Sequence, residues 1–345
     1  MYYNLNYKQY SDFLNLINGV FSPLKNFVTK DQFSTILIKK KFKENFFPFP
    51  IFFGLDKKQF NKIHKHKKLL FFYNSKKIAE VKNIKFYSIN KDLFGEKIFG
   101  KNYKIHPYFK VFNEDNYIFL SFEISKVYNT KKLPKYFIPP KLFKKKIQKI
   151  KFLPGFHTRN VPHTAHQWIH NYLFKKYGSL LIQPLIGQYK TGEYKNHIIM
   201  KSNLLALNFL KSKKVFCIPF FSYPRYGGPR EACLHAIVRK NYGCSHFWVG
   251  RDHAGYKNFF SIYASQKFCK LNQKKIGLNI VSEKEPSYCN IRKIVTNNYK
   301  DLKYKNNKIL ISGTKIRKFL INNKKIPKFL MSSKIAKLIS SKSLI

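Results

Sequence analysis

The sequence predicts an α/β protein in which a β-rich N-terminal part precedes a part built around a parallel sheet. The composition changes near residue 150: only four of the 15 glycines lie before it, whereas both tryptophans and eight of the 11 histidines lie after it. The hydrophobic pattern changes at the same point, from short runs between polar turns to strands that alternate with helices. We therefore expect a binding scaffold followed by a domain that carries the chemistry.

The first part contains short aromatic and β-branched runs at residues 69–73, 84–89 and 117–124. Polar turns separate these runs, which is the pattern of a β-rich domain. A lysine-rich segment at 141–151 is a plausible domain boundary, although such a charge run is also typical of a solvated surface. At 345 residues the chain is long enough for about two domains and a small third one.

After residue 150, buried strands are predicted at 150–153, 215–220 and 245–250, each followed by a turn that contains Gly, Pro or charged residues. Gly228 and Pro229 indicate the start of a helix, and Gly243 indicates its end. In open α/β sheets the ligand lies beyond the carboxyl ends of the strands. The segments HTRN and GRDH follow two of these strands, so we expect them at the ligand-binding edge.

Only seven of the 67 basic residues are arginine, and all seven follow residue 158. Lys, Asn, Phe, Ile and Tyr are abundant and share AT-rich codons, so we interpret the lysine excess as drift in base composition. The remaining arginines are then candidate functional residues, because a guanidinium fork suits phosphate and sulfate better than an ammonium group. They are Arg159, Arg225, Arg230, Arg239, Arg251, Arg292 and Arg317.

The formal net charge of +51 leaves nucleic-acid binding open as an alternative. The lysines of the chain are spread almost evenly along the sequence, however, and no DNA-binding motif is recognisable. The five cysteines, at 217, 233, 244, 269 and 289, form no CxxC pair, which favours reduced thiols. No apolar run reaches the roughly 18 residues of a membrane helix, and the N-terminus lacks the apolar segment of a signal peptide. We therefore expect a cytoplasmic protein.

The motif HTRNVPHTAH occupies residues 157–166. If His163 opens a helix that ends before Gly178, a rotation of about 100° per residue places His163, His166 and His170 on one face. We expect these imidazoles to face the edge where the strands end, where a helix N-terminus favours phosphate. Zinc binding is the weaker alternative, because no glutamate stands inside the HxxH pair. The opposite face, expected to pack inward, contains Ala165, Trp168, Ile169, Tyr172 and Leu173.

Two further motifs carry charged residues on turns. In VGRDHAG, residues 249–255, flanking glycines allow a ligand to approach the backbone closely. Asp252 is expected to orient Arg251 or His253 or to contact a nucleotide, and a structural ion pair is the alternative. In ISGTKIRKFL, residues 311–320, the Ser-Gly-Thr segment is expected to cap a short helix, a geometry that also binds anions.

Together these motifs resemble the ATP sulfurylase family, at FSPLKNF (21–27), TRNVPHTAH (158–166), the long run 224–255 and ISGTKIR (311–317). The resemblance implies a PUA-like N-terminal domain at 1–148, a Rossmann-like nucleotidyltransferase domain with a parallel sheet at 149–282, and a small C-terminal domain at 283–345. It also implies a homodimer. We expect no fused adenylylsulfate kinase domain.

The implied reaction joins sulfate to the α-phosphorus of MgATP, giving adenosine 5′-phosphosulfate and pyrophosphate. By the resemblance, Thr158, Arg159 and Asn160 form an active-site loop in which Arg159 holds sulfate, while His163 and His166 stabilise charge on the phosphates. The resemblance also assigns nucleotide or sulfate contacts to Gly250, Arg251, Asp252, His253, Ala254 and Pro286.

The sequence departs from the family at two places. His157 stands where the family usually has a glutamine that contacts sulfate and ATP, and we expect its imidazole to donate a hydrogen bond in place of the amide. Cys289 stands alone where many relatives have a cysteine cluster that binds zinc, so no structural zinc is expected. Another adenylyltransferase of the same superfamily is the alternative function. No role is assigned to Arg292, and the sequence does not indicate whether the reaction runs toward adenosine phosphosulfate or toward ATP.

Overall fold

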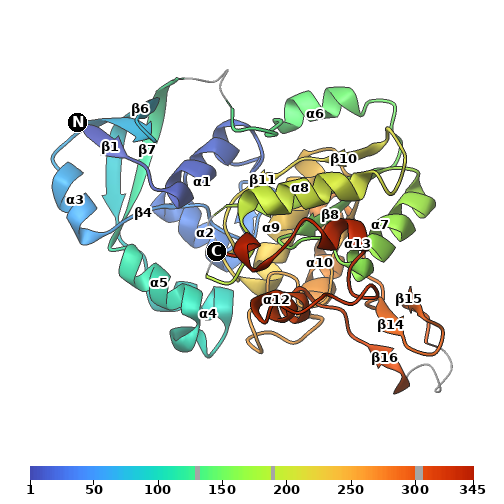
Figure 1. Cartoon of the computed structure of the whole chain (residues 1–345). Helices are drawn as coiled ribbons and strands as arrows, with labels where there is room; N and C mark the ends of the chain where they lie inside the picture. The colour runs from blue at the N-terminus through green and yellow to red at the C-terminus, as the bar shows by residue number, and fades with distance from the viewer. Residues whose placement is uncertain (129–132, 188–190, 300–305) are drawn as a thin grey trace. The chain divides into compact units, whose positions relative to one another are not determined.

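The computed structural model describes residues 1–128, 133–187, 191–299 and 306–345 (Figure 1). The chain forms two compact units, each built from three separate segments. Unit 1 comprises residues 1–146, 224–243 and 251–279, and unit 2 comprises residues 147–223, 244–250 and 280–345. The predicted domain limits at 148 and 282 follow chain order instead and stay a prediction.

Unit 1 contains a five-stranded sheet whose strands lie in the order β1 (Tyr2–Asn4), β5 (Lys68–Tyr73), β6 (Lys76–Tyr87), β7 (Ile118–Val127) and β4 (Phe53–Leu55). Strand β1 runs parallel to β5, and the other pairs are antiparallel. Asn74 and Ser75 join β5 to β6 with φ values of 47° and 59°, the positive angles that a tight hairpin turn requires. The three predicted strand runs are therefore confirmed, with β6 longer than expected.

Aromatic residues fill the core beside this sheet. The rings of Phe53, Phe71 and Phe122 lie 5.2–5.6 Å apart between centroids, within the range of favourable aromatic pairs. A short ribbon pairs β2 (Lys41–Phe42) with β3 (Asn45–Phe46). The helices of unit 1 are α1 (Tyr7–Ile17), α2 (Lys30–Lys39), α3 (Lys57–Ile63), α4 (Lys91–Phe99), α5 (Pro107–Asp115), α6 (Pro140–Lys146), α9 (Gly228–Asn241) and α10 (Ala264–Ile276), with a 3₁₀ turn at Tyr103–Ile105.

Unit 2 contains the predicted parallel sheet, with strands in the order β10 (Val215–Cys217), β9 (Leu180–Ile186), β8 (Pro154–Thr158), β12 (His246–Trp248) and β13 (Asn279–Val281). Strands β10, β9, β8 and β12 run parallel, and β11 (Phe220–Phe221) adds to β9. The strand predicted at 150–153 is wrong, because β8 begins at Pro154. Proline lacks a donor for the ladder but is tolerated as the first residue of a strand.

Among the described residues, the helices of unit 2 are α7 (Thr164–Tyr177), α8 (Asn196–Leu207), α12 (Gly313–Ile321) and α13 (Ser333–Ala336), with a 3₁₀ turn at Ser341–Ser343. A small antiparallel sheet has the order β15 (Ile294–Thr296), β14 (Ser287–Cys289), β16 (Lys308–Ile309), seen in orange and red in Figure 1. One core packs Phe156, Ile169 and Leu173 between the sheet and α7. A second core joins α8 to the C-terminal helices through Ile199, Ile316 and Leu330 among others, so the C-terminal segment shares its core with the rest of unit 2.

No helix in the described part of the chain combines the length and apolar character needed to cross a bilayer. All five cysteines are free thiols.

Candidate functional site

The loop Thr158–Asn160 lies at the carboxyl end of β8, as the sequence predicts. The Thr158 hydroxyl is buried and accepts a hydrogen bond from the Asn160 backbone N–H at 3.1 Å, which closes the turn. Asn203 of α8 donates from Nδ2 to the Asn160 carbonyl at 3.4 Å. The loop is therefore held both by its own hydroxyl and by a helix 43 residues further along the chain.

The ISGTKIR segment contacts the same loop. Arg317 of α12 donates from Nη1 to the Asn160 side-chain oxygen at 3.0 Å and from Nη2 to the Thr314 hydroxyl at 3.1 Å. A Cβ added at Gly313 would lie 2.9 Å from that same Asn160 oxygen, so a side chain at 313 would displace the Asn160 side chain. The predicted cap is confirmed, since the Ser312 hydroxyl accepts from the Lys315 N–H. Arg317, which we expected to bind an oxyanion, fixes the orientation of the Asn160 amide.

Arg159 forms an ion pair with Glu193, with 3.5 Å between Nη1 and Oε1. The segment that carries Glu193 is bonded to the last residues of the chain: Gly192 N–H donates to the Ile345 carbonyl, and Ile345 N–H donates to the Glu193 carbonyl, both at 2.8 Å. The side chain of Arg159 is 37% exposed. It therefore keeps an accessible surface while a carboxylate orients it.

His163 begins helix α7 as its N-cap, as predicted, and Gly178 ends the helix in the left-handed conformation. The His163 Nδ1 atom accepts a hydrogen bond from the His166 N–H at 3.2 Å. An accepting Nδ1 carries no proton, so the proton of the neutral ring lies on Nε2. Burial lowers the pKa of His163 to about 3, which keeps the ring neutral near pH 7. His163 is thus a neutral Nε2–H donor beside the N-terminus of a helix.

His163, His166 and His170 share one face of α7, as predicted. The rings of His163 and His166 stack with centroids 3.7 Å apart. The expectation that this face is turned away from the core is wrong, because His166 and His170 meet the ring of Phe156 in β8 edge to face, at 5.2 and 4.6 Å.

Burial, followed by repulsion from His163, lowers the pKa of His170 to about 3. Burial and repulsion from its two neighbours also hold the pKa of His166 well below its usual value. All three rings are therefore neutral near pH 7, so they offer hydrogen bonds rather than positive charge.

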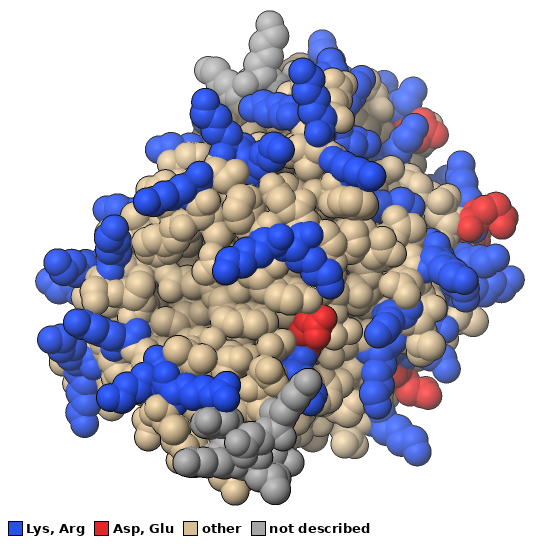
Figure 2. All heavy atoms as spheres, turned by 90° about the vertical axis from the view of Figure 1, so that its right-hand side faces the viewer, with Lys and Arg blue, Asp and Glu red and all other residues tan. Residues whose placement is uncertain are grey.

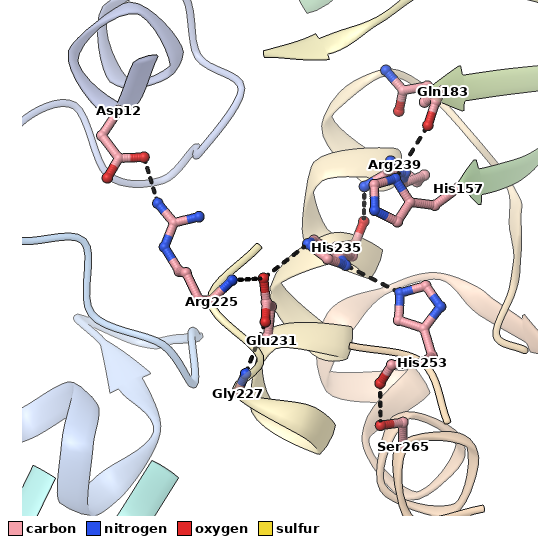
Figure 3. Close-up of polar contacts among 10 residues, drawn as sticks. All are labelled: Asp12, His157, Gln183, Arg225, Gly227, Glu231, His235, Arg239, His253 and Ser265. Carbon is pink, nitrogen blue, oxygen red and sulfur yellow. Dashed lines mark hydrogen bonds and ion pairs between the residues drawn. The ribbon is translucent and has the colours of Figure 1, made fainter. Parts of the chain in front are cut away.

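His157 and Gln183 are paired across the parallel strands β8 and β9. The Nδ1 atom of His157 lies 3.1 Å from the Gln183 carbonyl oxygen (Figure 3). Because a carbonyl oxygen can only accept, the proton of the ring is on Nδ1. The Nε2 atom of a neutral His157 is then an acceptor. The expected hydrogen bond from the imidazole to an oxyanion is available only when this ring is protonated.

In unit 1 the RDHAG segment at 251–255 has an unusual backbone. Asp252 and Ala254 have φ values of 50° and 59°, and the Asp252 N–H donates to the Ile262 carbonyl at 2.8 Å. A Cβ at Gly255 would lie 1.9 Å from an Asp252 carboxylate oxygen, so a larger residue there would displace the Asp252 side chain. The Asp252 carboxyl thus folds back onto its own turn, and Arg251 is exposed.

A buried chain of polar contacts in unit 1 leads to this turn, and the sequence did not predict it (Figure 3). Asp12 of α1 pairs with Arg225. Glu231 of α9 accepts the N–H groups of Arg225 and Gly227 at 2.9 and 2.8 Å and lies 3.6 Å from His235 Nε2. His235 Nδ1 in turn lies 3.0 Å from His253 Nε2. The one available signal was the Glu231–His235 spacing of four residues, which places both on one helix face.

Two other arginines lie near the two ends of α9, and their side chains are buried. Arg230 donates to the Leu37 carbonyl at 2.8 Å, and burial lowers its pKa to about 10. Arg239 is fully buried and donates to the His235 carbonyl at 3.1 Å. Of the remaining predicted residues, Pro286 is buried directly before β14, and Arg292 is exposed.

Comparison with known proteins gives three findings. The family model described as ATP-sulfurylase matches residues 134–342, and that described as a PUA-like domain matches residues 2–128, which confirms the predicted N-terminal fold. Curated proteins named sulfate adenylyltransferase, from Pyrococcus abyssi and Ignicoccus hospitalis, are 32% and 30% identical to this chain. They match over 320 and 317 residues, which cover 89% of this chain and 81% of each relative.

A solved structure, the hexameric APS kinase from Thiobacillus denitrificans, matches 98% of this chain with a TM-score of 0.74 and 14% identity. This chain spans 62% of that one. At this level of identity the likeness shows a shared fold.

Proposed function

Because the chain belongs to the ATP-sulfurylase family, we propose that it is a sulfate adenylyltransferase, which converts MgATP and sulfate reversibly to adenosine 5′-phosphosulfate and pyrophosphate. A sulfate oxygen forms a bond to the α-phosphorus while the bond to the bridging oxygen breaks, and pyrophosphate leaves in line. Sulfate carries no proton that must be removed, so no general base is needed. Catalysis then rests on positioning and on stabilising developing negative charge. Magnesium enters with ATP as part of the substrate.

The observation that carries this proposal is the loop Thr158–Asn160, fixed at the carboxyl end of β8 directly before the N-terminus of α7. Sulfate is bound by Arg159, whose planar fork can hold two oxygens at once. Asn160 has its side-chain oxygen occupied by Arg317. Its amide nitrogen is then the end of the side chain that donates to the anion.

His163 and His166 act on the phosphates as neutral donors. Their lowered pKa values mean that they contribute hydrogen bonds without positive charge. A neutral imidazole in a low-dielectric setting can still stabilise an oxyanion, provided that its N–H is preorganised. The hydrogen bond that His163 accepts as N-cap supplies this preorganisation.

In the same proposal the 250–255 turn binds the nucleotide. Arg251 and His253 contact the phosphates, Gly250 and Asp252 line the nucleotide, the Ala254 amide reaches sulfate, and Pro286 lies near adenine, all by resemblance. The positive φ values of Asp252 and Ala254 support this role, because strained turns cluster at ligand-binding sites.

The test is ATP formation from adenosine phosphosulfate and pyrophosphate by the purified protein. We expect activity in the wild type and a loss of about 10²–10³-fold in kcat for Arg159→Lys, since a lysine cannot replace a fork aimed at an oxyanion. Arg251→Ala should show a comparable loss. Arg292→Ala, which changes an exposed arginine with no assigned role, is the matched control and should keep wild-type activity. An inactive wild type would rule out the proposed function.

We also propose that the protein is cytoplasmic and forms a homodimer. Light scattering of the purified protein would test the dimer.

Figure 2 shows Lys and Arg side chains dispersed over one face with uncharged surface between them, rather than gathered in a stripe. This dispersion argues against a nucleic-acid groove. DNA retention that persists at about 0.5 M salt would favour nucleic-acid binding instead. Assays in both directions would show which direction is faster in this protein.

A further inference from the structure

Gln183 of β9 is fully buried, yet neither its amide nitrogen nor its amide oxygen has a hydrogen-bond partner among the described residues. A buried primary amide that makes no hydrogen bond loses its hydration without compensation, so such groups are rare in folded proteins. The position is well defined by its backbone, which pairs with β8 in the parallel sheet. None of the described residues supplies a partner for this amide.

The amide lies beside His157. Residues 157 and 183 are in register on neighbouring strands, and paired positions send their side chains to the same face of a sheet. Figure 3 shows both side chains extending from their strands to the same side. The adjacent pair, Phe156 and Ile182, belongs to the core on the other face, under α7. Gln183 thus shares a sheet face with the one residue at which this chain departs from the sulfate-contacting glutamine of its family.

The hydrogen bonding of His157 explains why a second side chain is needed. Its Nδ1–H is donated to the Gln183 carbonyl, so a neutral ring presents a lone pair on Nε2. A lone pair repels a sulfate oxygen, whereas the glutamine that the family uses at this position offers an N–H₂ donor. The amide of Gln183 offers the same donor from the neighbouring strand.

We propose that Gln183 donates from Nε2 to an oxygen of the bound sulfate, and so provides the amide that His157 replaces. This inference rests on the proposed function. The ligand class is a tetrahedral oxyanion, which has only acceptor atoms and therefore matches the donor end of the amide. The hydrogen bond also explains why a fully buried glutamine is kept in a strand whose other residues are all buried too, most of them apolar.

The test uses Gln183→Met, which keeps the length of the side chain and removes both polar atoms. Removing an unsatisfied buried amide should raise the melting temperature in the absence of sulfate. The KM for sulfate should rise about tenfold or more, the loss expected for a hydrogen bond to a charged group, while the KM for MgATP changes by less than about threefold. Gln183→Met combined with His157→Gln returns an amide to this sheet face and should recover most of the sulfate affinity.

A matched control is Gln9→Met. Gln9 is also buried, but its Nε2 donates to the Tyr3 hydroxyl and the Gly54 carbonyl, both at 2.9 Å. Its replacement should lower the melting temperature and leave the KM for sulfate unchanged. The two substitutions should therefore change the melting temperature in opposite directions, and only Gln183→Met should raise the KM for sulfate.

A second readout separates this inference from the proposed function. Sulfate should raise the melting temperature of the wild type, compared with KCl at equal ionic strength, and should do so less in Gln183→Met. If the wild type forms no ATP from adenosine phosphosulfate, the proposed function fails, and this binding difference still decides the role of Gln183. An unchanged sulfate KM in an active Gln183→Met variant, or an unchanged sulfate-induced shift, would overturn the inference.

Discussion

Glu231 and His235 of α9 differ from His170 and Gln183 around β8 in how their hydrogen bonds are satisfied. In α9, Glu231 and His235 are 1% and 4% exposed, and both lie in a continuous series of contacts from Arg225 to His253. Around β8, His170 and Gln183 are 2% and 0% exposed, and each keeps a side-chain atom without a partner in the described part of the chain. The two pairs of side chains are similarly buried, but only the pair in α9 has hydrogen-bond or ion-pair partners for the atoms compared.

This difference in hydrogen bonding suggests a way to distinguish residues that support the fold from residues that bind a ligand. A fully paired network holds the backbone in one arrangement, because each group left alone would be strongly unfavourable. Unpaired buried groups lower stability, and proteins retain them where a ligand or a reaction uses them. By this criterion Glu231 and His235 support the turn at 250–255, and the unpaired groups of β8, β9 and α7 agree with our proposal that this region binds substrate.

The largest effect should follow from breaking the α9 network. Glu231→Ala leaves the N–H groups of Arg225 and Gly227 without their buried acceptor and removes the carboxylate beside His235. We expect the free energy of unfolding to fall by about 3–5 kcal/mol, as for other buried charges that lose a partner. Urea unfolding of the variant measures this loss.

The control for that experiment is Glu114→Ala, which removes an exposed carboxylate from α5. It should change the free energy of unfolding by no more than about 0.5 kcal/mol. If Glu231→Ala lowers the free energy of unfolding by less than about 1 kcal/mol, the buried contacts of Glu231 do not stabilise the fold.

The α7 histidines should give a pH dependence of stability. The pKa of His170 is lowered to about 3 in the folded protein, against about 6.5 in an unfolded chain. The unfolded state therefore binds an extra proton between these values, so stability is lost as the pH falls from about 6.5 toward 3. His170→Leu removes this proton-binding group. The slope of the free energy of unfolding against pH, below about pH 6.5, should therefore fall by up to about 1.4 kcal/mol per pH unit.

Urea unfolding at pH 8, 6, 5 and 4 measures this slope. Because the His170 Nε2 atom has no partner among the described residues, the leucine should change stability at pH 8 by less than about 1 kcal/mol. Asn171→Leu, on the exposed side of the same helix, binds no proton and should keep the wild-type slope. An unchanged slope for His170→Leu would mean that this ring is not held neutral by burial.

The predictable parts of the fold were those with local signals. Helix α7 follows from its histidine N-cap and its glycine stop, and α9 from Gly228, Pro229 and Gly243, all close in sequence. The β8 loop was placed correctly, although the strand itself begins later than expected. There the apolar run at 150–153 was mistaken for the strand that follows it.

The contacts that define the site could not be predicted, because they join distant residues of ordinary type. Asp12 and Arg225 are 213 positions apart, and Asn160 and Arg317 are 157 apart. His166 and His170 pack against Phe156, which no spacing rule connects to them. The arginine pattern was informative only in part, since Arg225, Arg230 and Arg239 bind carboxylate or backbone groups inside the protein.

The smallest predicted effect concerns Arg317, which acts on the site through Asn160. Arg317→Ala frees the amide of Asn160 to rotate, so its donor is aimed at the anion for only part of the time. We expect kcat/KM to fall about tenfold, the value of roughly one hydrogen bond, with little change in melting temperature because Arg317 is only half-buried. Arg317→Lys can still donate to the Asn160 oxygen and should recover activity to within about threefold. Lys318→Ala changes an exposed charge on the same helix and is the control. If Arg317→Ala matches that control, the guanidinium does not position the loop, and the contact at 3.0 Å is structural only.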